Sequence, residues 1–382
     1  MIPTIHLAFV DDWELRGDGS GNVEKLQVEP MRRLVDIFDK YGIRGSFNVE
    51  VMQQMAFRTV EDHHPELKRY ADLWEEAVTE TYSKGHDIQL HIHPQWKDAK
   101  YLDGKWELAS DWSILNYSPA DAAKMLNAGR ELLEKLLRPV DPAYKCVSFR
   151  SGSWCIAPSS FILDLLVDMG IVFDMSIVAG VEYRTNRITL DYTKCDEPFL
   201  PYYPVMTDAR RMSDKREPIV CVPTNHFYRT RRHLAKHHIK QAVQRARKGF
   251  GSGAPSLPTS GGDSYYSEWA DVGHSSSVRK LYDKLVIPYA KGKHFISDIA
   301  QLDYQLMTEM LAAIRRRARA TGQREVPIVL ENHTKDITDF HDIERFVADV
   351  AVADDIKCVT LTEVAGGIKE GNFKIAKRVT RN

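Results

Sequence analysis

Residues 4–13, TIHLAFVDDW, decide the fold class of this chain. A mostly apolar run at 5–10 is typical of a short buried strand, and it ends directly in two carboxylates, Asp11 and Asp12. In α/β barrels the side chains that carry out chemistry lie at the carboxyl ends of the strands. The stretch therefore predicts a first strand that delivers carboxylates to a site. An Asx turn or a helix N-cap is the structural alternative for such aspartates.

The same kind of run recurs along the chain. Seven further short β-rich runs predict strands at 44–49, 87–91, 146–149, 171–174, 219–222, 326–331 and 357–361. Amphipathic stretches predict helices between them, at 29–41, 67–84, 119–137, 159–169 and 304–320. Alternating strands and helices favour βαβ units around a parallel sheet or barrel.

Two regions depart from this alternation. Residues 93–118 contain Trp96, Trp106 and Trp112 with little periodicity, and they predict a long loop over one end of the barrel. Residues 183–303 predict a large insertion. We therefore expect the first part of the barrel at 1–182, the insertion at 183–303, and the last barrel strands and helices at 304–382.

The insertion contains a basic run at 229–250, followed by a Gly/Ser/Pro-rich segment at 249–262. Such a run is either the solvated face of a helix or a patch that binds phosphate, sulfate or an anionic glycan. Because the run is single and the whole chain is not basic, a nucleic acid partner is not expected.

The composition is that of a globular protein with a large core, since 43% of the 382 residues are hydrophobic and 27% are charged. The formal net charge of −1 gives no electrostatic argument for a nucleic acid or membrane partner. The N-terminus lacks a basic region followed by an apolar one, and the run at 5–10 is too short to span a bilayer. Five dispersed cysteines without a CxxC pair are typical of reduced thiols. We expect a cytoplasmic protein without a transmembrane segment.

The predicted strands end in ionisable side chains that have complementary chemistry. These are Asp11 and Asp12, His91 and His93, Arg150, Asp174, and His333. Each such group costs desolvation at a buried strand end unless it is paired, so their repetition predicts one common site.

His91 and His93 are two residues apart, so their side chains share one side of an extended strand. Two imidazoles and one carboxylate form a common site for zinc and similar divalent ions. We therefore predict that Asp12, His91 and His93 hold a divalent metal, Zn²⁺ first, with Co²⁺ or Ni²⁺ as alternatives.

The other strand ends predict supporting roles. Arg150 is expected to pair with Asp11 and to lower the pKa of that carboxyl. His333 is expected to protonate a leaving group, and Asp174 to orient the imidazole of His333 or to keep it charged. Surface salt bridges are the structural alternative for each of these residues.

The order of these motifs resembles the polysaccharide deacetylase family, carbohydrate esterase family 4. The matching segments are AFVDDW (8–13), GHDIQLHIHPQW (85–96), FRSGSW (149–154), FDMSI (173–177) and LENH (330–333). The similarity covers residues 1–177 and 326–363. It implies an α/β fold, a distorted (β/α)7 barrel, and a metal-dependent N- or O-deacetylase that acts on glycans.

The resemblance also implies a role for each matched position. Asp11 would be the catalytic base, and Arg150 would orient it. Asp12, His91 and the following histidine would bind the metal. His333 would be the acid, tuned by Asp174.

The chain departs from the family pattern at several positions. The family spaces its histidines HxxxH, whereas the second histidine here is His93 and position 95 is Gln95. Trp13 replaces the glycine after the aspartates, and Gly152 and Trp154 stand where a proline and a tyrosine are usual. These changes indicate a divergent branch with a different leaving-group pocket. Substrate contacts are expected at Trp13, Trp96 and Trp154.

The leading hypothesis is an intracellular deacetylase of an amino-sugar substrate in glycan or antibiotic biosynthesis, with anionic and nucleotide- or lipid-linked sugars among the candidate substrates. One alternative is an amidohydrolase of non-sugar C–N bonds, such as a ureide or a cyclic imide. The other is a non-catalytic barrel that binds a glycan through its basic run and through Trp96, Trp106 and Trp112.

Overall fold

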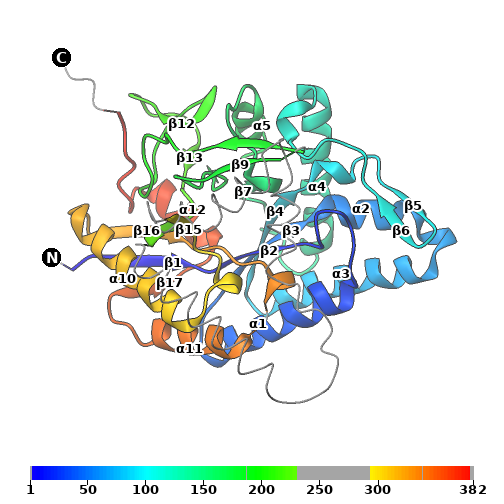
Figure 1. Ribbon diagram of the computed structural model, residues 1–382, viewed down its shortest axis with the longest axis horizontal. Coiled ribbons are helices and arrows are strands. Elements are labelled where there is room, and N and C mark those ends of the chain that lie inside the picture. Colours follow the sequence, from blue (N-terminus) through cyan, green and yellow to red (C-terminus); the bar gives the residue numbers. More distant parts are fainter. Residues whose placement is uncertain (1, 186, 230–292, 338, 379–382) are drawn as a thin grey trace, which may run out of the picture.

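Parallel strands form the centre of the molecule, in a computed structural model that describes residues 2–185, 187–229, 293–337 and 339–378 (Figure 1). The larger sheet has the order β13-β8-β7-β4-β3-β2. Its strands are β2 (Val10–Trp13), β3 (Ser46–Glu50), β4 (Asp87–Ile92), β7 (Ser148–Ser151), β8 (Phe173–Asp174) and β13 (Val220–Cys221). The smaller sheet has the order β16-β1-β17, with β1 (Thr4–Ala8), β16 (Glu325–Val329) and β17 (Ile356–Cys358). All eight runs predicted from the sequence thus contain strands.

The two sheets meet in a barrel-like arrangement. β1 and β2 are separated only by Phe9, so one extended segment belongs to both sheets. Single parallel bridges join Thr224 to Val329 and Asp11 to Asn332. Within the described residues these bridges do not extend into ladders that close a barrel. The predicted α/β fold of the deacetylase-barrel kind is confirmed, with the ring of strands only partly hydrogen-bonded.

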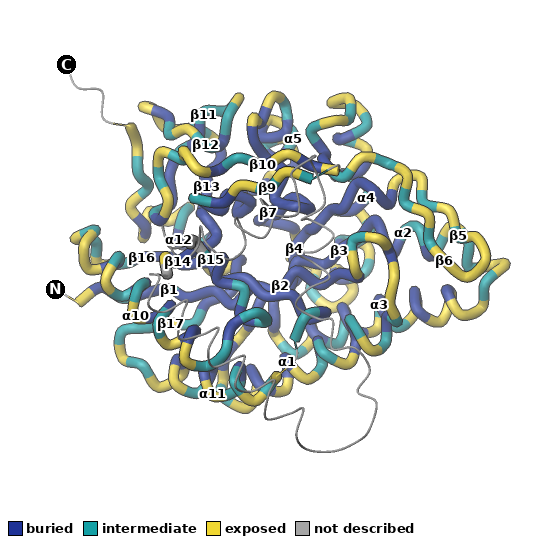
Figure 2. Tube along the Cα trace, viewed as in Figure 1, coloured by how far each residue is buried: buried dark blue, intermediate teal, exposed yellow. Residues whose placement is uncertain are grey.

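Helices cover the outside of the strands, with exposed outer faces over buried strands (Figure 2). Five lie where the sequence predicts them: α1 (Glu29–Lys40), α3 (Pro65–Ser83), α4 (Pro119–Leu137), α5 (Ile162–Asp168) and α10 (Tyr304–Ala320). Three further helices of the described residues were not predicted: α2 (Val51–Val60), α11 (Phe340–Ala351) and α12 (Leu361–Glu370). In α1 the buried residues include Met31, Leu34, Val35 and Phe38, whose spacing places them on one helix face.

Short antiparallel hairpins decorate this framework. The predicted loop at 93–118 contains β5 (Lys100–Leu102) and β6 (Lys105–Glu107). The described part of the range 183–303 contributes β13 to the larger sheet and three hairpins besides. These are β9 (Glu182–Arg184) with β10 (Thr189–Asp191), β11 (Pro204–Val205) with β12 (Asp208–Met212), and β14 (His226–Arg229) with β15 (Lys293–Ile296). The predicted basic run, from residue 230 on, and the Gly/Ser/Pro-rich segment lie outside the described residues.

The five cysteines are free thiols, as the sequence predicts. No helix within the described ranges combines the length and the apolar character needed to cross a bilayer. The cytoplasmic location stays a prediction.

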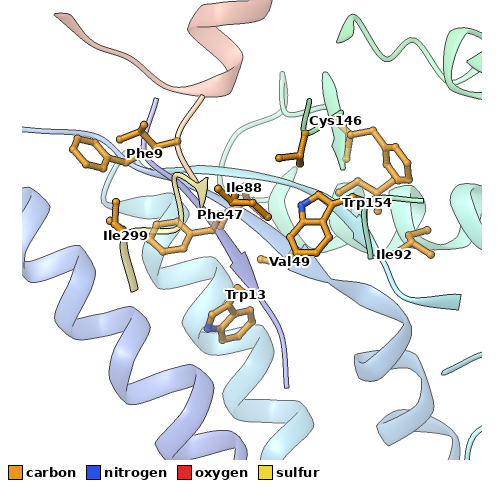
Figure 3. Packing of buried hydrophobic residues seen from close by; sticks show 14 of the residues in the cluster. Phe9, Trp13, Phe47, Val49, Ile88, Ile92, Cys146, Trp154 and Ile299 are labelled. Carbon is orange, nitrogen blue, oxygen red and sulfur yellow. The ribbon is translucent and has the colours of Figure 1, made fainter. Parts of the chain in front are cut away.

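Trp13 belongs to the hydrophobic core (Figure 3). Its side chain is fully buried, its ring packs on Trp74 at 5.6 Å between centroids, and its Nε1–H donates to the Gln27 carbonyl oxygen at 2.9 Å. The prediction that Trp13 contacts substrate is therefore corrected. Alternation along β2 turns this side chain toward the helices and away from the face that carries Asp12.

Replacing Trp13 by Phe tests this assignment. The substitution W13F keeps an aromatic ring but leaves the Gln27 carbonyl without its donor, so we expect a loss of about 1–3 kcal/mol in the free energy of unfolding. Urea denaturation measures this loss. An unchanged stability together with a raised KM would instead place Trp13 against the substrate.

Candidate active site

The carboxylate nearest to the histidine pair is Glu14, the residue that directly follows β2. Its Oε2 lies 3.1 Å from Nε2 of His91 and contacts Nε2 of His93 directly. Asp12, two residues earlier on the same side of the strand, is more distant, with Oδ2 4.0 Å from Nε2 of His91. Sequence reasoning missed Glu14. The signal was present, because the two-residue spacing of Asp12 and Glu14 matches that of His91 and His93.

The ring of His91 is oriented by the neighbouring strand. Its Nδ1 lies 2.8 Å from the backbone carbonyl oxygen of Arg150, and a carbonyl only accepts hydrogen bonds. Nδ1 therefore carries a hydrogen, and Nε2 faces Glu14 and Asp12. Burial opposes the charged form, but the attraction of Asp12 and Glu14 prevails and raises the pKa of His91 to about 9. The two carboxylates that face Nε2 of His91 therefore favour a proton or a metal cation at this atom.

Gln95 contacts the ring of His93, and Glu50 holds its backbone. Nδ1 of His93 lies 2.9 Å from the side-chain nitrogen of Gln95, while Oε1 of Gln95 is buried without a hydrogen-bond partner among the described residues. The two ends of an amide have nearly the same shape, so a half-turn of Gln95 brings its oxygen to accept from Nδ1–H. That turn satisfies the buried oxygen and leaves the Nε2 lone pair facing Glu14. Glu50 accepts from the backbone N–H of His93.

Glu14, His91 and His93 meet the requirements of a divalent metal site. All three are buried, and one ligand atom from each lies within 4.8 Å of the other two. Ligand atoms around a tetrahedral zinc, with bonds of about 2.0–2.1 Å, stand roughly 3.3 Å apart. The 3.1 Å between Glu14 and His91 is close to that spacing.

A second group, Asp12, Glu331 and His333, also lies within 4.8 Å. It suits a cation less well for two reasons. The separations of His333 from its partners are wider, 4.0 Å to Asp12 and 3.8 Å to Glu331. The guanidinium of Arg150, 2.8 Å from Asp12 and 3.9 Å from Glu331, already supplies positive charge there.

Arg150 pairs with Asp12, and the predicted pairing with Asp11 is wrong. Its Nη1–H donates to Oδ1 of Asp12 at 2.8 Å, and Asn48 donates to the same oxygen at 2.9 Å. Burial favours the neutral acid, but the charges of Arg150 and His91 hold the pKa of Asp12 below its usual value. The reason is geometric, because adjacent side chains on β2 point to opposite faces and Arg150 lies on the face of Asp12.

Asp11 lies in a different environment. Its Oδ1 accepts from the side-chain amide of Asn332, and burial raises its pKa to about 8 despite the attraction of His333. In this arrangement the carboxyl of Asp11 is largely protonated at neutral pH.

His333 is oriented by Asp298, and the predicted partner Asp174 is wrong. Nδ1 of His333 lies 2.9 Å from Oδ2 of Asp298, whereas Asp174 accepts hydrogen bonds from the hydroxyl and backbone N–H of Ser176. Burial opposes protonation, but Asp298 raises the pKa of His333 to about 10. Nε2 of His333 faces Oδ2 of Asp12 at 4.0 Å. No strand-end motif marked Asp298, which lies in the range interpreted as an insertion.

The predicted substrate tryptophans occupy different places. Trp154 borders the site, since its Nε1–H donates to Glu331 at 3.0 Å and its ring stands edge-on to His333 at 6.2 Å. The ring of Trp154 also stacks on Tyr183 of β9, at 6.0 Å. Trp96 is buried against Phe57, so it supports the loop after β4.

Comparisons with known proteins find relatives at the level of structure. No family profile matches the sequence, and no curated protein matches it. A solved structure from Mycobacterium smegmatis, described as a polysaccharide deacetylase, superposes with a TM-score of 0.51 at 14% identity, over 100% of this chain and 96% of the other. The chain has the polysaccharide deacetylase fold.

Two further structures resemble this deacetylase fold more distantly. One from Pseudomonas aeruginosa PAO1, described as a polysaccharide deacetylase, has a TM-score of 0.48 at 11% identity, over 97% of this chain and 93% of the other. The allantoinase Puue has a TM-score of 0.44 at 10% identity, over 95% of this chain and 89% of the other.

Metal content distinguishes Glu14 from Asp12 as the carboxylate ligand. We expect the purified protein, after incubation with Zn²⁺ and desalting, to retain one ion per chain. E14Q and H91A should lose most of it, because each removes a ligand atom from the buried triad. D12N should keep it, since Asn still accepts from Arg150. Mass spectrometry of the eluted metal measures the ratio, and the opposite outcome for E14Q and D12N would return the ligand role to Asp12.

Proposed function

We propose that this chain is a metal-dependent deacetylase that removes an acetyl or related acyl group from an amino-sugar substrate. The observation that carries the proposal is the position of Asp12. Its Oδ2 lies 4.0 Å from Nε2 of His91, on the side of the metal-ligand triad, and 4.0 Å from Nε2 of His333 on the other side. An ionised carboxylate between a metal site and a protonated imidazole supplies the base and the acid for hydrolysis of an amide.

Glu14, His91 and His93 would hold the metal, for which Zn²⁺ is the first choice and Co²⁺ or Ni²⁺ are alternatives. A divalent ion bound there would polarise the acyl carbonyl and lower the pKa of a water molecule. This proposal moves the carboxylate ligand from Asp12, as the sequence predicts, to Glu14.

Asp12 is the proposed base, in place of Asp11. Arg150 and Asn48 both donate to Oδ1, which leaves Oδ2 to accept the proton of the attacking water. The low pKa of Asp12 means that this oxygen is available as a carboxylate at neutral pH. The protonated state of Asp11 makes it a poor candidate for the same task.

His333 is the proposed acid. As the water oxygen bonds to the acyl carbon and the C–N bond breaks, Nε2–H of His333 donates its proton to the departing nitrogen. Asp298 keeps the imidazole protonated through Nδ1. The products are a carboxylic acid and a free amine.

Trp154 and Tyr183 would form one wall of the space for the leaving group, since they stack on each other beside His333. The substrate class follows from the motif resemblance and from the fold shared with polysaccharide deacetylases. Glycan or antibiotic biosynthesis in the cytoplasm is the corresponding proposed setting.

Acetate release tests the proposal. We expect the Zn²⁺-loaded protein to release acetate from N-acetylglucosamine or its oligomers, measured by a coupled assay, and to lose this activity on chelation. D12N should lower kcat by at least about 100-fold, because it removes the base. D11N, the matched control on the neighbouring residue, should lower it less than about tenfold. Hydrolysis of a ureide or cyclic imide without acetate release would favour the ring-amide alternative instead.

The pH dependence of the reaction tests the role of Asp298. In D298N the imidazole of His333 loses the charge that raises its pKa, so the alkaline limb of the kcat/KM profile should move to lower pH by roughly 1–3 units. D174N, at a carboxyl that accepts its hydrogen bonds from Ser176 instead of His333, is the control and should leave the limb in place. NMR titration of the His333 ring in the metal-free protein gives the same comparison without catalysis. Equal profiles for D298N and wild type would remove Asp298 from the mechanism.

A further inference from the structure

Lys335 is a buried lysine that contacts one of the proposed metal ligands. It lies in a short 3₁₀ helix, η7 (Thr334–Asp336), which begins directly after His333. Its side chain is 1% exposed, and its Nζ donates to Oε1 of Glu14. The same Nζ lies 3.5 Å from the carbonyl oxygen of Leu15. A buried ammonium is costly unless it is paired, so the contact with Glu14 is what allows this charge to be buried.

The two oxygens of Glu14 have different partners. Oε1 accepts from Lys335, whereas Oε2 lies 3.1 Å from Nε2 of His91 and contacts Nε2 of His93. A carboxylate without such a partner binds a cation through one oxygen or through both. We propose that Lys335 is a positioning residue, which occupies Oε1 of Glu14 and thereby limits Glu14 to a single-oxygen metal ligand. The inference rests on the metal site of the proposed function and deepens it.

The other ionised carboxylate of the site, that of Asp12, is divided in the same way. Its Oδ1 accepts from Arg150, and its Oδ2 lies 4.0 Å from Nε2 of both His91 and His333. In each carboxylate one oxygen is bound by a buried cation, and the other oxygen is turned toward the histidines. Since the two cations come from different elements, β7 and η7, the same division arises twice. Lys335 thus orients its carboxylate as Arg150 does.

The backbone that carries Lys335 is tied to the strand that carries Glu14. The backbone N–H of Asp12 donates to the carbonyl oxygen of Asn332 at 2.8 Å, so the end of β2 is joined to the segment that leads into η7. Lys335 therefore reaches Glu14 from a backbone held beside β2. This attachment keeps the ammonium on the same carboxylate oxygen.

The number of oxygens that Glu14 offers affects which metal the site prefers. Two imidazoles and a single carboxylate oxygen suit Zn²⁺, which takes about four ligands in a tetrahedral arrangement. Mn²⁺ prefers oxygen ligands in an octahedral arrangement. Without Lys335, Glu14 would offer its second oxygen, and the site would become more favourable for Mn²⁺. Lys335 therefore contributes to the selection of Zn²⁺ over Mn²⁺.

The variant K335M tests the coordination directly, because it removes the ammonium and keeps a side chain of similar length. We expect crystal structures of the Zn²⁺-loaded proteins to show one oxygen of Glu14 at about 2.0–2.2 Å from the ion in the wild type. In K335M both oxygens should lie within about 2.5 Å of the ion.

Metal affinities give a second measurement in solution. Competition with a chelator measures Kd for Zn²⁺ and for Mn²⁺, and we expect the ratio of Kd for Mn²⁺ to Kd for Zn²⁺ to fall by at least about tenfold in K335M. A lysine that only supported folding would change both affinities together and leave the ratio as it is. K97M, at an exposed lysine that pairs with Asp98, is the control and should keep the wild-type ratio.

The outcomes separate this inference from the proposed function. Coordination through one oxygen in K335M, or an unchanged ratio, overturns the role of Lys335, and acetate release by the wild type then leaves the deacetylase standing. Coordination through both oxygens in the wild type overturns the role as well, even if K335M does not fold. A lowered ratio in K335M without acetate release by the wild type supports Lys335 and counts against the deacetylase alone. A wild type that binds no Zn²⁺ overturns both.

Discussion

The buried guanidinium of Arg150 is the charge around which the strand ends are arranged. It is fully buried, it donates to Asp12 and to the hydroxyl of Thr224, and it lies 3.9 Å from Glu331. Its own backbone carbonyl accepts from His91, so one residue of β7 connects β4, β2, the segment after β13 and the segment after β16. A buried cation without such partners costs several kcal/mol. The pairing of Arg150 therefore decides which of the two aspartates is ionised, and the division of roles in the site follows from that choice.

The positive charge of Arg150 does not neutralise all of the buried carboxyl groups around it. Burial raises the pKa of Asp11 and Glu50 to about 8 and that of Glu331 to about 7, so the folded chain keeps part of its carboxyl groups protonated. The same surplus raises the pKa of His91 and His333, whereas burial lowers the pKa of His93. A divalent cation beside Glu14 would replace protons on these groups, and binding of the metal would be coupled to proton release. This charge balance explains why such a site is tolerated in a core that is otherwise apolar.

The sequence predicts the framework well where local signals are complete. The helices at 119–137 and 304–320 match α4 and α10 residue for residue, since Ser118 and Asp303 cap them and apolar residues recur at helical spacing. α2 was missed because it begins directly after β3, with Glu50 serving both as the end of the strand and as the N-cap. The structure brings the predicted residues Asp12, His91, His93, Arg150 and His333 close together, and their roles stay predictions. The partners of Arg150 and His333 were not predicted, because pairing depends on which face of β2 each side chain takes and on Asp298, which is distant in sequence.

The departures from the deacetylase motif pattern compensate one another. The family spacing HxxxH would place the second histidine at position 95, and this chain has Gln95 there, with His93 two residues earlier. On the first strand the carboxylate that meets the histidines is Glu14, two residues after Asp12. Because side chains on a strand repeat every two residues, both shifts keep their groups on the inner face of the sheet. We therefore interpret the altered pattern as a metal site displaced along β2 and β4, which lie on either side of β3, with Gln95 supporting the proposed ligand His93. Because Glu14 is the carboxylate that contacts the histidines, Asp12 pairs with Arg150 instead.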